Sequence, residues 1–174
     1  MLDRDAALRA LEELASVLES RGIAGRMFVV GGAAIALAFD ARRTTLDIDA
    51  IFEPKSEVYS AAREVANRLN LPDDWLNDAV KGFIPGTDPD ALPIFDRPGL
   101  AVSAASARFL LAMKLRAARV ELDVDDIRFL AKVLGLESPE EVLQVATERY
   151  NAEDLPPRAR FLVQELFGGG AASS

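Results

Sequence analysis

The chain has 174 residues and a mass of 18.8 kDa, which suits one domain or a small domain with a helical appendage. It contains neither Cys nor His, which excludes disulfides, cysteine nucleophiles, thiolate zinc sites and histidine-dependent catalysis. The formal net charge of −8 argues against a general nucleic-acid-binding surface, although a local basic groove remains compatible with it.

The first third of the chain alternates between helical and strand patterns. Apolar residues at helical spacing predict an amphipathic helix over residues 3–21. A β-prone run at residues 26–30 is interrupted by Gly31 and Gly32, and residues 33–39 then look helical. The expected order is therefore strand, glycine turn and helix.

Residues 44–52 alternate between two sets of side chains, which predicts a strand with one buried and one wet face. The apolar face would hold Leu46, Ile48, Ala50 and Phe52. The opposite face would hold Thr45, Asp47, Asp49 and Ile51.

The middle of the chain predicts a helix over residues 56–69 and a second, short helix over residues 72–80, with Trp75 in the core. Residues 82–98 are rich in proline and glycine and are expected to form a loop. Residues 99–103 (GLAVS) predict a further strand.

The last part of the chain is expected to be helical. Helices are predicted over residues 104–120 and 157–167. A further helix over residues 123–134 is expected to end at Gly135, and another is expected to start at the capping box of Ser138. The fold class is therefore α/β (α+β), a mixed sheet with flanking helices. We expect an α/β core at 1–103, a helical part at 104–167 of the same compact unit, and a disordered tail at 168–174.

The Asp47-Ile48-Asp49 triplet is the most informative feature of the sequence. Carboxylates at positions i and i+2 of a strand project to the same side, where they can share one or two cations. Without a cation they would be a solvated strand face, in which close like charges are unfavourable. Because His and Cys are absent, the expected cofactor is a hard cation, Mg²⁺ or Mn²⁺.

Gly31 and Gly32 stand between an apolar strand and an apolar helix. Backbone N–H groups at such a turn, and the helix N-terminus after it, can bind a phosphate. A tight turn that needs a positive φ would require the same glycines. Together with the Asp-x-Asp strand, the turn predicts a phosphate site beside a metal site.

Lys114 lies in an apolar helix, where it either extends its amine to solvent or meets a buried anion. Asp123 and Asp126 are spaced i, i+3 and share a helix face; acids favoured by the helix dipole would give the same pattern.

Three segments resemble a known superfamily. Residues 28–52 (FVVGGAAIALAFDARRTTLDIDAIF) resemble motif I of the DNA polymerase β-like nucleotidyltransferases, in which Gly-Gly or Gly-Ser precedes an Asp-x-Asp strand. Residues 73–85 (DDWLNDAVKGFIP) and 100–136 look like the small bacterial branch related to the AbiEii and MenT toxins. That branch shows a helical Lys, then an Arg and a D-x-x-D-I pattern, whereas Gly32 stands here where many members have Ser.

This resemblance implies roles for individual residues. Asp47 and Asp49 would bind the metal and act in catalysis, and Gly31 and Gly32 would bind the nucleotide. Lys114 would contact the triphosphate, and Asp126, or alternatively Asp123, would be a functional acid near it. Arg43 would bind a phosphate of the nucleotide. The secondary candidates are Asp123, Arg119 as partner of Asp126, Asn77 at a ribose or base, and Thr45.

The resemblance also implies a function. The first hypothesis is a toxin-like nucleotidyltransferase that uses an NTP to modify RNA, with the tRNA 3′ end as acceptor and a cognate antitoxin as possible partner. The alternatives are an adenylyltransferase for a protein or a small hydroxylated molecule, and an inactive binding module of the same fold. No apolar run reaches the roughly 20 residues of a membrane span, so we expect a cytoplasmic protein without a membrane partner.

Overall fold

The structure, a computed structural model, describes residues 1–171. Contacts divide the chain into two compact units. The first comprises Met1–Gly82 and Pro89–Ala105, and the second comprises Phe83–Asp88 and the chain from Ser106 onward. That 1–103 and 104–167 form one compact unit stays a prediction.

The first unit is built on a five-stranded mixed sheet with the order β3-β2-β1-β5-β4. Strand β1 runs antiparallel to β2 and parallel to β5, β3 is parallel to β2, and β4 is antiparallel to β5. The strands are β1 (Gly25–Val29), β2 (Ile48–Glu53), β3 (Leu76–Asn77), β4 (Leu92–Arg97) and β5 (Leu100–Ala104). This mixed sheet with flanking helices confirms the predicted fold class.

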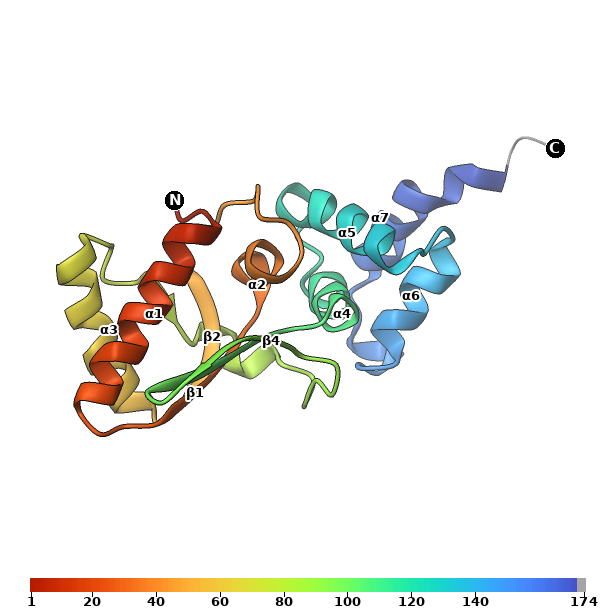
Figure 1. The fold of residues 1–174 in the computed structure, drawn as a ribbon. Coiled ribbons are helices and arrows are strands. Elements are labelled where there is room, and N and C mark those ends of the chain that lie inside the picture. Colours follow the sequence, from red (N-terminus) through yellow and green to blue (C-terminus); the bar gives the residue numbers. More distant parts are fainter. Residues whose placement is uncertain (172–174) are drawn as a thin grey trace. The chain divides into compact units, whose positions relative to one another are not determined.

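Three helices pack on one face of this sheet: α1 (Arg4–Ser20), α2 (Gly31–Ala38) and α3 (Lys55–Leu69) (Figure 1). The strand side chains on that face are buried: Met27, Val29, Ile48, Ala50, Phe52, Leu100, Val102 and Ala104. The side chains of the other face, such as Phe28, Asp49 and Ser103, keep part of their surface exposed. Alternation along each strand therefore gives the sheet a core face and a second, accessible face.

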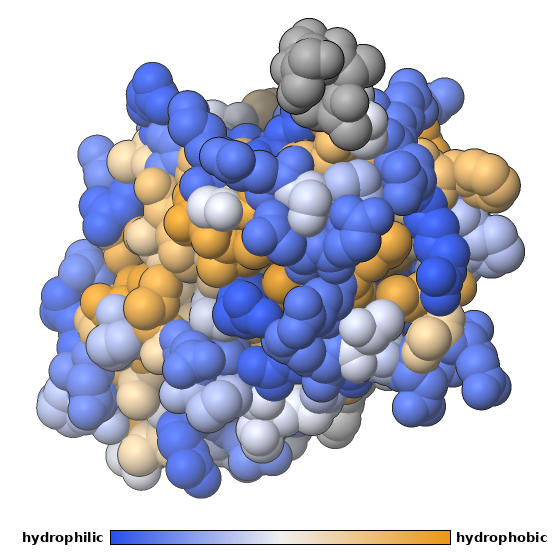
Figure 2. Space-filling model, turned by 90° about the vertical axis from the view of Figure 1, so that its right-hand side faces the viewer, coloured by the Kyte–Doolittle hydropathy of each residue, from blue (hydrophilic) through white to orange (hydrophobic). Residues whose placement is uncertain are grey.

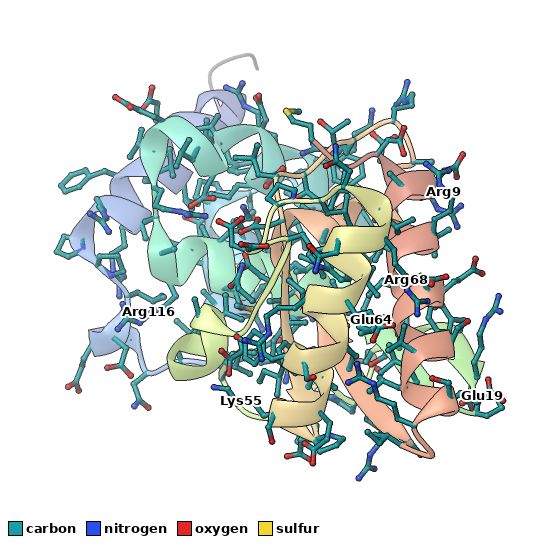
Figure 3. The ribbon with its side chains drawn as sticks, turned by 90° about the vertical axis from the view of Figure 1, so that its left-hand side faces the viewer. Arg9, Glu19, Lys55, Glu64, Arg68 and Arg116 are labelled. Atoms are coloured by element: carbon teal, nitrogen blue, oxygen red, sulfur yellow. The ribbon has the colours of Figure 1, made fainter. Side chains whose placement is uncertain are left out.

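Charged residues link α1 and α3 at their outer surface (Figure 3). Arg68 pairs with Glu13 of α1 and with Glu64 one turn earlier in α3, and Arg21 lies 2.6 Å from Glu64. Such exposed pairs contribute little each. The layer is stabilised mainly by fully buried side chains between the helices and the sheet, among them Leu11, Leu14, Val58 and Val65.

The second unit is helical, as predicted. It contains α4 (Ala107–Ala117), α5 (Val120–Leu134), α6 (Pro139–Thr147) and α7 (Pro157–Phe167), with a short 3₁₀ helix η2 (Ala152–Asp154) before α7. Two predicted helix boundaries are confirmed, because Gly135 is left-handed after α5 and Ser138 forms a capping box with Glu141. The helix predicted over residues 104–120 is shorter, because Ala104 belongs to β5 and Ala118 ends α4 in a left-handed conformation. Helix α5 starts at Val120, three residues before its predicted start. Residues Gly168–Ala171 form the 3₁₀ helix η3, and residues 172–174 lie outside the described residues. The disordered tail expected at 168–174 stays a prediction.

Two predictions for residues 72–98 are wrong. Residues 72–80 form a turn, the short strand β3 and the start of the 3₁₀ helix η1 (Ala79–Phe83), not a helix. The predicted loop contains strand β4, which includes Pro93. A proline is tolerated there because β4 is at the edge of the sheet and its register shifts between Pro93 and Phe95. Trp75 is buried as predicted, and its indole N–H donates to the Ala62 carbonyl at 3.0 Å.

Figure 2 shows a face covered largely by hydrophilic side chains, with apolar side chains in scattered patches. None of the described helices combines the length and the apolar character that a membrane span requires.

Candidate active site

Six predicted site residues are linked by direct contacts or by strand pairing within the first unit. We call them the aspartate–glycine cluster: Gly31, Gly32, Thr45, Asp47, Asp49 and Asn77. They come from the start of α2, the segment before β2, β2 itself and β3.

The glycine pair forms the first turn of α2 and does not precede it, so this helix begins two residues before its predicted start. Gly31 has a φ of 65°, which favours glycine because other residues are strained there. A β-carbon on Gly31 would lie 3.3 Å from Asp49 Oδ2, and one on Gly32 would lie 3.4 Å from Thr45 Oγ1. The glycines therefore let the helix backbone approach the acidic segment closely.

The N-terminus of α2 has the properties of an anion site. Its N-cap, Val30, has no side chain that could accept a hydrogen bond from the first turn, and the first N–H groups of a helix lack partners within the helix. The backbone N–H of Val30 donates to the Asp49 carbonyl at 2.9 Å, which holds β2 against this turn. A helix N-terminus with available N–H groups attracts phosphate and carboxylate groups.

Asp47 does not lie on the strand, contrary to the prediction for residues 44–52, because β2 starts at Ile48. Thr45 pairs instead with Leu2 through two backbone hydrogen bonds of 2.7 and 2.9 Å. This pairing diverts the chain before β2, and it leaves Leu46 74 % exposed where the alternation predicts burial. The Thr45 hydroxyl also donates to the Asp47 carbonyl at 2.8 Å, so it orders the segment that holds Asp47.

Asn77 connects the two aspartates. Its Nδ2 donates to Asp47 Oδ2 at 2.9 Å, and its Cα is the register partner of Asp49 on the neighbouring strand. Sequence reasoning missed this role, because a separation of 30 residues and an unpredicted strand hide the contact. A role of Asn77 at a ribose or base stays a prediction.

The second unit contains a compact charged group that we call the lysine–aspartate cluster: Lys114, Arg119, Asp123 and Asp126. Lys114 Nζ lies 2.8 Å from Asp123 Oδ1 and 2.7 Å from Asp126 Oδ2. Arg119 Nε and one terminal nitrogen each lie 3.1 Å from Asp123 oxygens. Arg119 therefore pairs with Asp123, and its expected pairing with Asp126 stays a prediction.

Asp123 is the centre of this cluster and is fully buried. Burial would raise the pKa of its carboxyl, but the hydrogen bonds from Arg119 and Lys114 outweigh burial and lower that pKa below its usual value. The formal charges of the four side chains cancel, which makes the burial of Asp123 tolerable, whereas the Arg119 side chain stays 58 % exposed. The anions that neutralise Lys114 are thus Asp123 and Asp126, at least in the protein alone.

Arg43, the remaining candidate, lies in the turn between α2 and β2. Its Nε is 4.0 Å from Asp40 Oδ2, and its side chain is 27 % exposed. Its proposed role at a phosphate stays a prediction.

The donors of the aspartate–glycine cluster fit a hard divalent cation. Asp47 and Asp49 offer carboxylate oxygens, and both side chains remain partly exposed. Among the described residues, no group of three or more His, Cys, Asp or Glu side chains is arranged to hold a metal. A cation here would therefore complete its shell with water and phosphate oxygens, as Mg²⁺ commonly does.

Comparison with known proteins identifies the family. A family model described as a nucleotidyltransferase of unknown function (DUF6036) matches residues 6–131, a region that includes both clusters. No match is found among curated proteins or among solved structures. The match extends over well over half of the chain, from α1 into α5, and the chain therefore belongs to this family of nucleotidyltransferases.

Proposed function

We propose that this protein is a metal-dependent nucleotidyltransferase that transfers a nucleotide from an NTP to RNA, with the 3′ end of tRNA as the first candidate acceptor. The observation that supports it most is the approach of Gly31 to Asp49 at the start of α2. A phosphate bound by the first N–H groups of α2 would lie next to the Asp49 carboxylate. Two anions at this separation repel each other unless a cation lies between them.

In this proposal Asp47 and Asp49 hold Mg²⁺ or Mn²⁺, and the backbone at Gly31 and Gly32 orients the triphosphate. Divalent cations held there would activate the attacking hydroxyl and neutralise charge on the departing pyrophosphate. The acceptor hydroxyl oxygen forms a bond to the α-phosphorus while the bond to the bridging oxygen of the β-phosphate breaks. The fixed backbone and carboxylates would contribute by positioning and electrostatic stabilisation.

Lys114, Asp126 and Arg43 complete the proposed machinery. Lys114 is the proposed cation for the triphosphate, and Asp126 is the acid that orients its amine. An ammonium group has three N–H donors, and the contacts with Asp123 and Asp126 occupy two of them. The third N–H would be available for an anion, and Arg43 is separately proposed to bind a phosphate oxygen.

RNA is the preferred acceptor because residues 73–85 and 100–136 resemble the small bacterial branch related to the AbiEii and MenT toxins. The same resemblance suggests a cognate antitoxin as partner. The net charge of −8 is unfavourable for RNA binding in general. A cleft can nevertheless be positive locally in an acidic protein, and bound cations would add to that potential.

The same net charge favours a second candidate function. An acidic surface attracts cationic acceptors, so an adenylyltransferase that modifies an aminoglycoside-like amine-rich molecule, or a basic protein, is the alternative. A non-catalytic binding module is disfavoured, because Asp47, Asp49, Lys114 and Asp126 are present together.

An acceptor survey tests the proposal. The protein would be incubated with each of the four α-labelled NTPs, Mg²⁺ or Mn²⁺, and either total RNA, cell lysate protein or an aminoglycoside panel. We expect label on RNA of tRNA size. Label on protein or on a small molecule, with RNA unlabelled, would replace the first candidate by the second, and no label with any acceptor would contradict both.

A further inference from the structure

We infer that Asn77 is a positioning residue for the proposed cation site: it holds one oxygen of Asp47 so that the other faces the cation. This inference rests on the proposed function. The observation behind it is the 2.9 Å hydrogen bond from Asn77 Nδ2 to Asp47 Oδ2.

The hydrogen bond acts on an acid that lies outside the sheet ladder. Asp47 precedes β2 and is not part of the sheet ladder, so the strand does not fix its side chain. Asn77, by contrast, is in β3 and pairs in register with Asp49. The amide therefore ties Asp47, which precedes the strand, to the sheet position that pairs with Asp49.

The orientation of the Asn77 amide is itself defined. The backbone N–H of Ala79 donates to Asn77 Oδ1 at 3.2 Å, which assigns the oxygen to that side and leaves Nδ2 to face Asp47. An amide nitrogen can only donate, so it stabilises a carboxylate oxygen and cannot itself bind a cation. Oδ1 of Asp47 forms no hydrogen bond with the described residues and remains the oxygen for a metal.

The residue after Asn77 is anchored by a second set of contacts. The Tyr59 hydroxyl donates to Asp78 Oδ1 at 2.7 Å and accepts from the Asp78 backbone N–H at 3.2 Å. Lys55, labelled at the start of α3 in Figure 3, pairs with the other Asp78 oxygen. Hydrogen bonds from Lys55 and then Tyr59 lower the pKa of the Asp78 carboxyl. The end of β3 is thus fixed to α3, and with it the amide that reaches Asp47.

The physical benefit is preorganisation. Two carboxylates that approach one cation repel each other in its absence, and an unrestrained Asp47 would turn away. A neutral donor on Oδ2 opposes that movement without competing for the cation. Outer-shell partners of metal ligands commonly contribute a 10- to 100-fold factor in metal affinity.

The test is a calorimetric titration with Mn²⁺ of three proteins: wild type, Asn77→Ala and Asn77→Leu. A non-hydrolysable NTP analogue is present throughout. Asn77→Leu retains side-chain volume without the donor. Asn67→Ala is the matched control, because Asn67 is an exposed asparagine on α3 of the same unit. Thermal unfolding of each variant reports folding separately.

We expect Mn²⁺ affinity to fall about 10-fold or more in both Asn77 variants and to be unchanged in Asn67→Ala. The thermal unfolding midpoints of the Asn77 variants should stay close to that of wild type, so that unfolding does not explain the loss of affinity. Wild-type affinity in Asn77→Ala or Asn77→Leu would overturn the positioning role while leaving the proposed function intact. A lower thermal midpoint with unchanged affinity would assign Asn77 to folding alone. Absence of Mn²⁺ binding in wild type would overturn the proposed function and, with it, this inference.

Discussion

Gly31 and Asp49 approach so closely that a β-carbon on Gly31 would lie 3.3 Å from the Asp49 Oδ2 atom. The first residue of α2 has a φ of 65° at the same point. The backbone conformation therefore favours glycine beside the proposed metal ligand, and a side chain here would also press on the Asp49 carboxylate.

Gly31→Ala is expected to destabilise the protein and to weaken nucleotide binding. A left-handed conformation costs a non-glycine residue about 1–2 kcal/mol, and the new methyl group would displace Asp49. Gly32→Ala is the matched control, since Gly32 has no such φ and alanine is about 1 kcal/mol better than glycine within a helix. Urea unfolding and NTP-analogue titration would measure both effects. Equal stability and affinity in Gly31→Ala and Gly32→Ala would contradict the requirement for glycine at residue 31.

Lys114→Met should destabilise the helical unit strongly. Removal of one partner from a buried ion pair costs about 3–5 kcal/mol, and here two carboxylates, Asp123 and Asp126, would lose their shared cation. Lys132→Met, at an exposed lysine of α5, should change the free energy of unfolding by less than about 0.5 kcal/mol. Chemical denaturation distinguishes them. A Lys114→Met protein as stable as Lys132→Met would mean that the charged cluster does not stabilise the fold.

Acidification should weaken the same unit through Asp123. The pKa of the Asp123 carboxyl is lowered in the folded protein. The ionised carboxylate therefore stabilises the fold fully above the ordinary carboxyl pKa of 3.8, and this stabilisation is lost as pH falls through the lower pKa of the folded state. Asp123→Asn should therefore be less stable than wild type near neutral pH, and the difference should shrink below about pH 4. Asp125→Asn, at an exposed neighbour, is the control. A stability difference that does not vary with pH would contradict this linkage.

Tyr150 should ionise late in an alkaline titration. Burial raises its pKa from 10.0 to about 12, against a smaller opposing effect of Arg116. A raised pKa in the folded state means that stability is complete below about pH 10 and is lost as pH approaches 12. Ultraviolet absorbance of tyrosinate should show a late step in wild type that Tyr150→Phe lacks. Ionisation of that residue near pH 10 in the folded protein would contradict its burial.

Sequence patterns correctly predicted the helix boundaries that are determined by neighbouring residues. The capping box at Ser138 and the glycine end at Gly135 depend on neighbouring residues, and both are confirmed. Strand β4 was missed because Pro93 is acceptable only at a sheet edge, and position in the sheet is a tertiary property.

Sequence patterns predicted only part of the candidate site, because some of its contacts are local and others depend on long-range pairing. The Gly-Gly and Asp-x-Asp motifs are adjacent in sequence, and the structure brings Gly31 to Asp49. The pairing of Thr45 with Leu2, which moves Asp47 off the strand, joins residues 43 positions apart along the chain. The resemblance placed an acid, Asp126 or Asp123, near Lys114, whereas the contact between Asn77 and Asp47 depends on the pairing of β2 with β3. Long-range pairing cannot be read from a single sequence.

The most direct test of the central claim is a comparison of α-labelled and γ-labelled NTP in reactions with purified tRNA, Mg²⁺ or Mn²⁺, and either wild type or Asp49→Ala. Nucleotidyl transfer retains the α-phosphate on the acceptor and releases the γ-phosphate in pyrophosphate. We predict that wild type labels tRNA with the α-label only, that a chelator abolishes labelling, and that Asp49→Ala, folded as judged by circular dichroism, does not label it. Transfer of the γ-label, or α-labelling that persists in Asp49→Ala or in chelator, would contradict the assignment of a metal-dependent nucleotidyltransferase to this site.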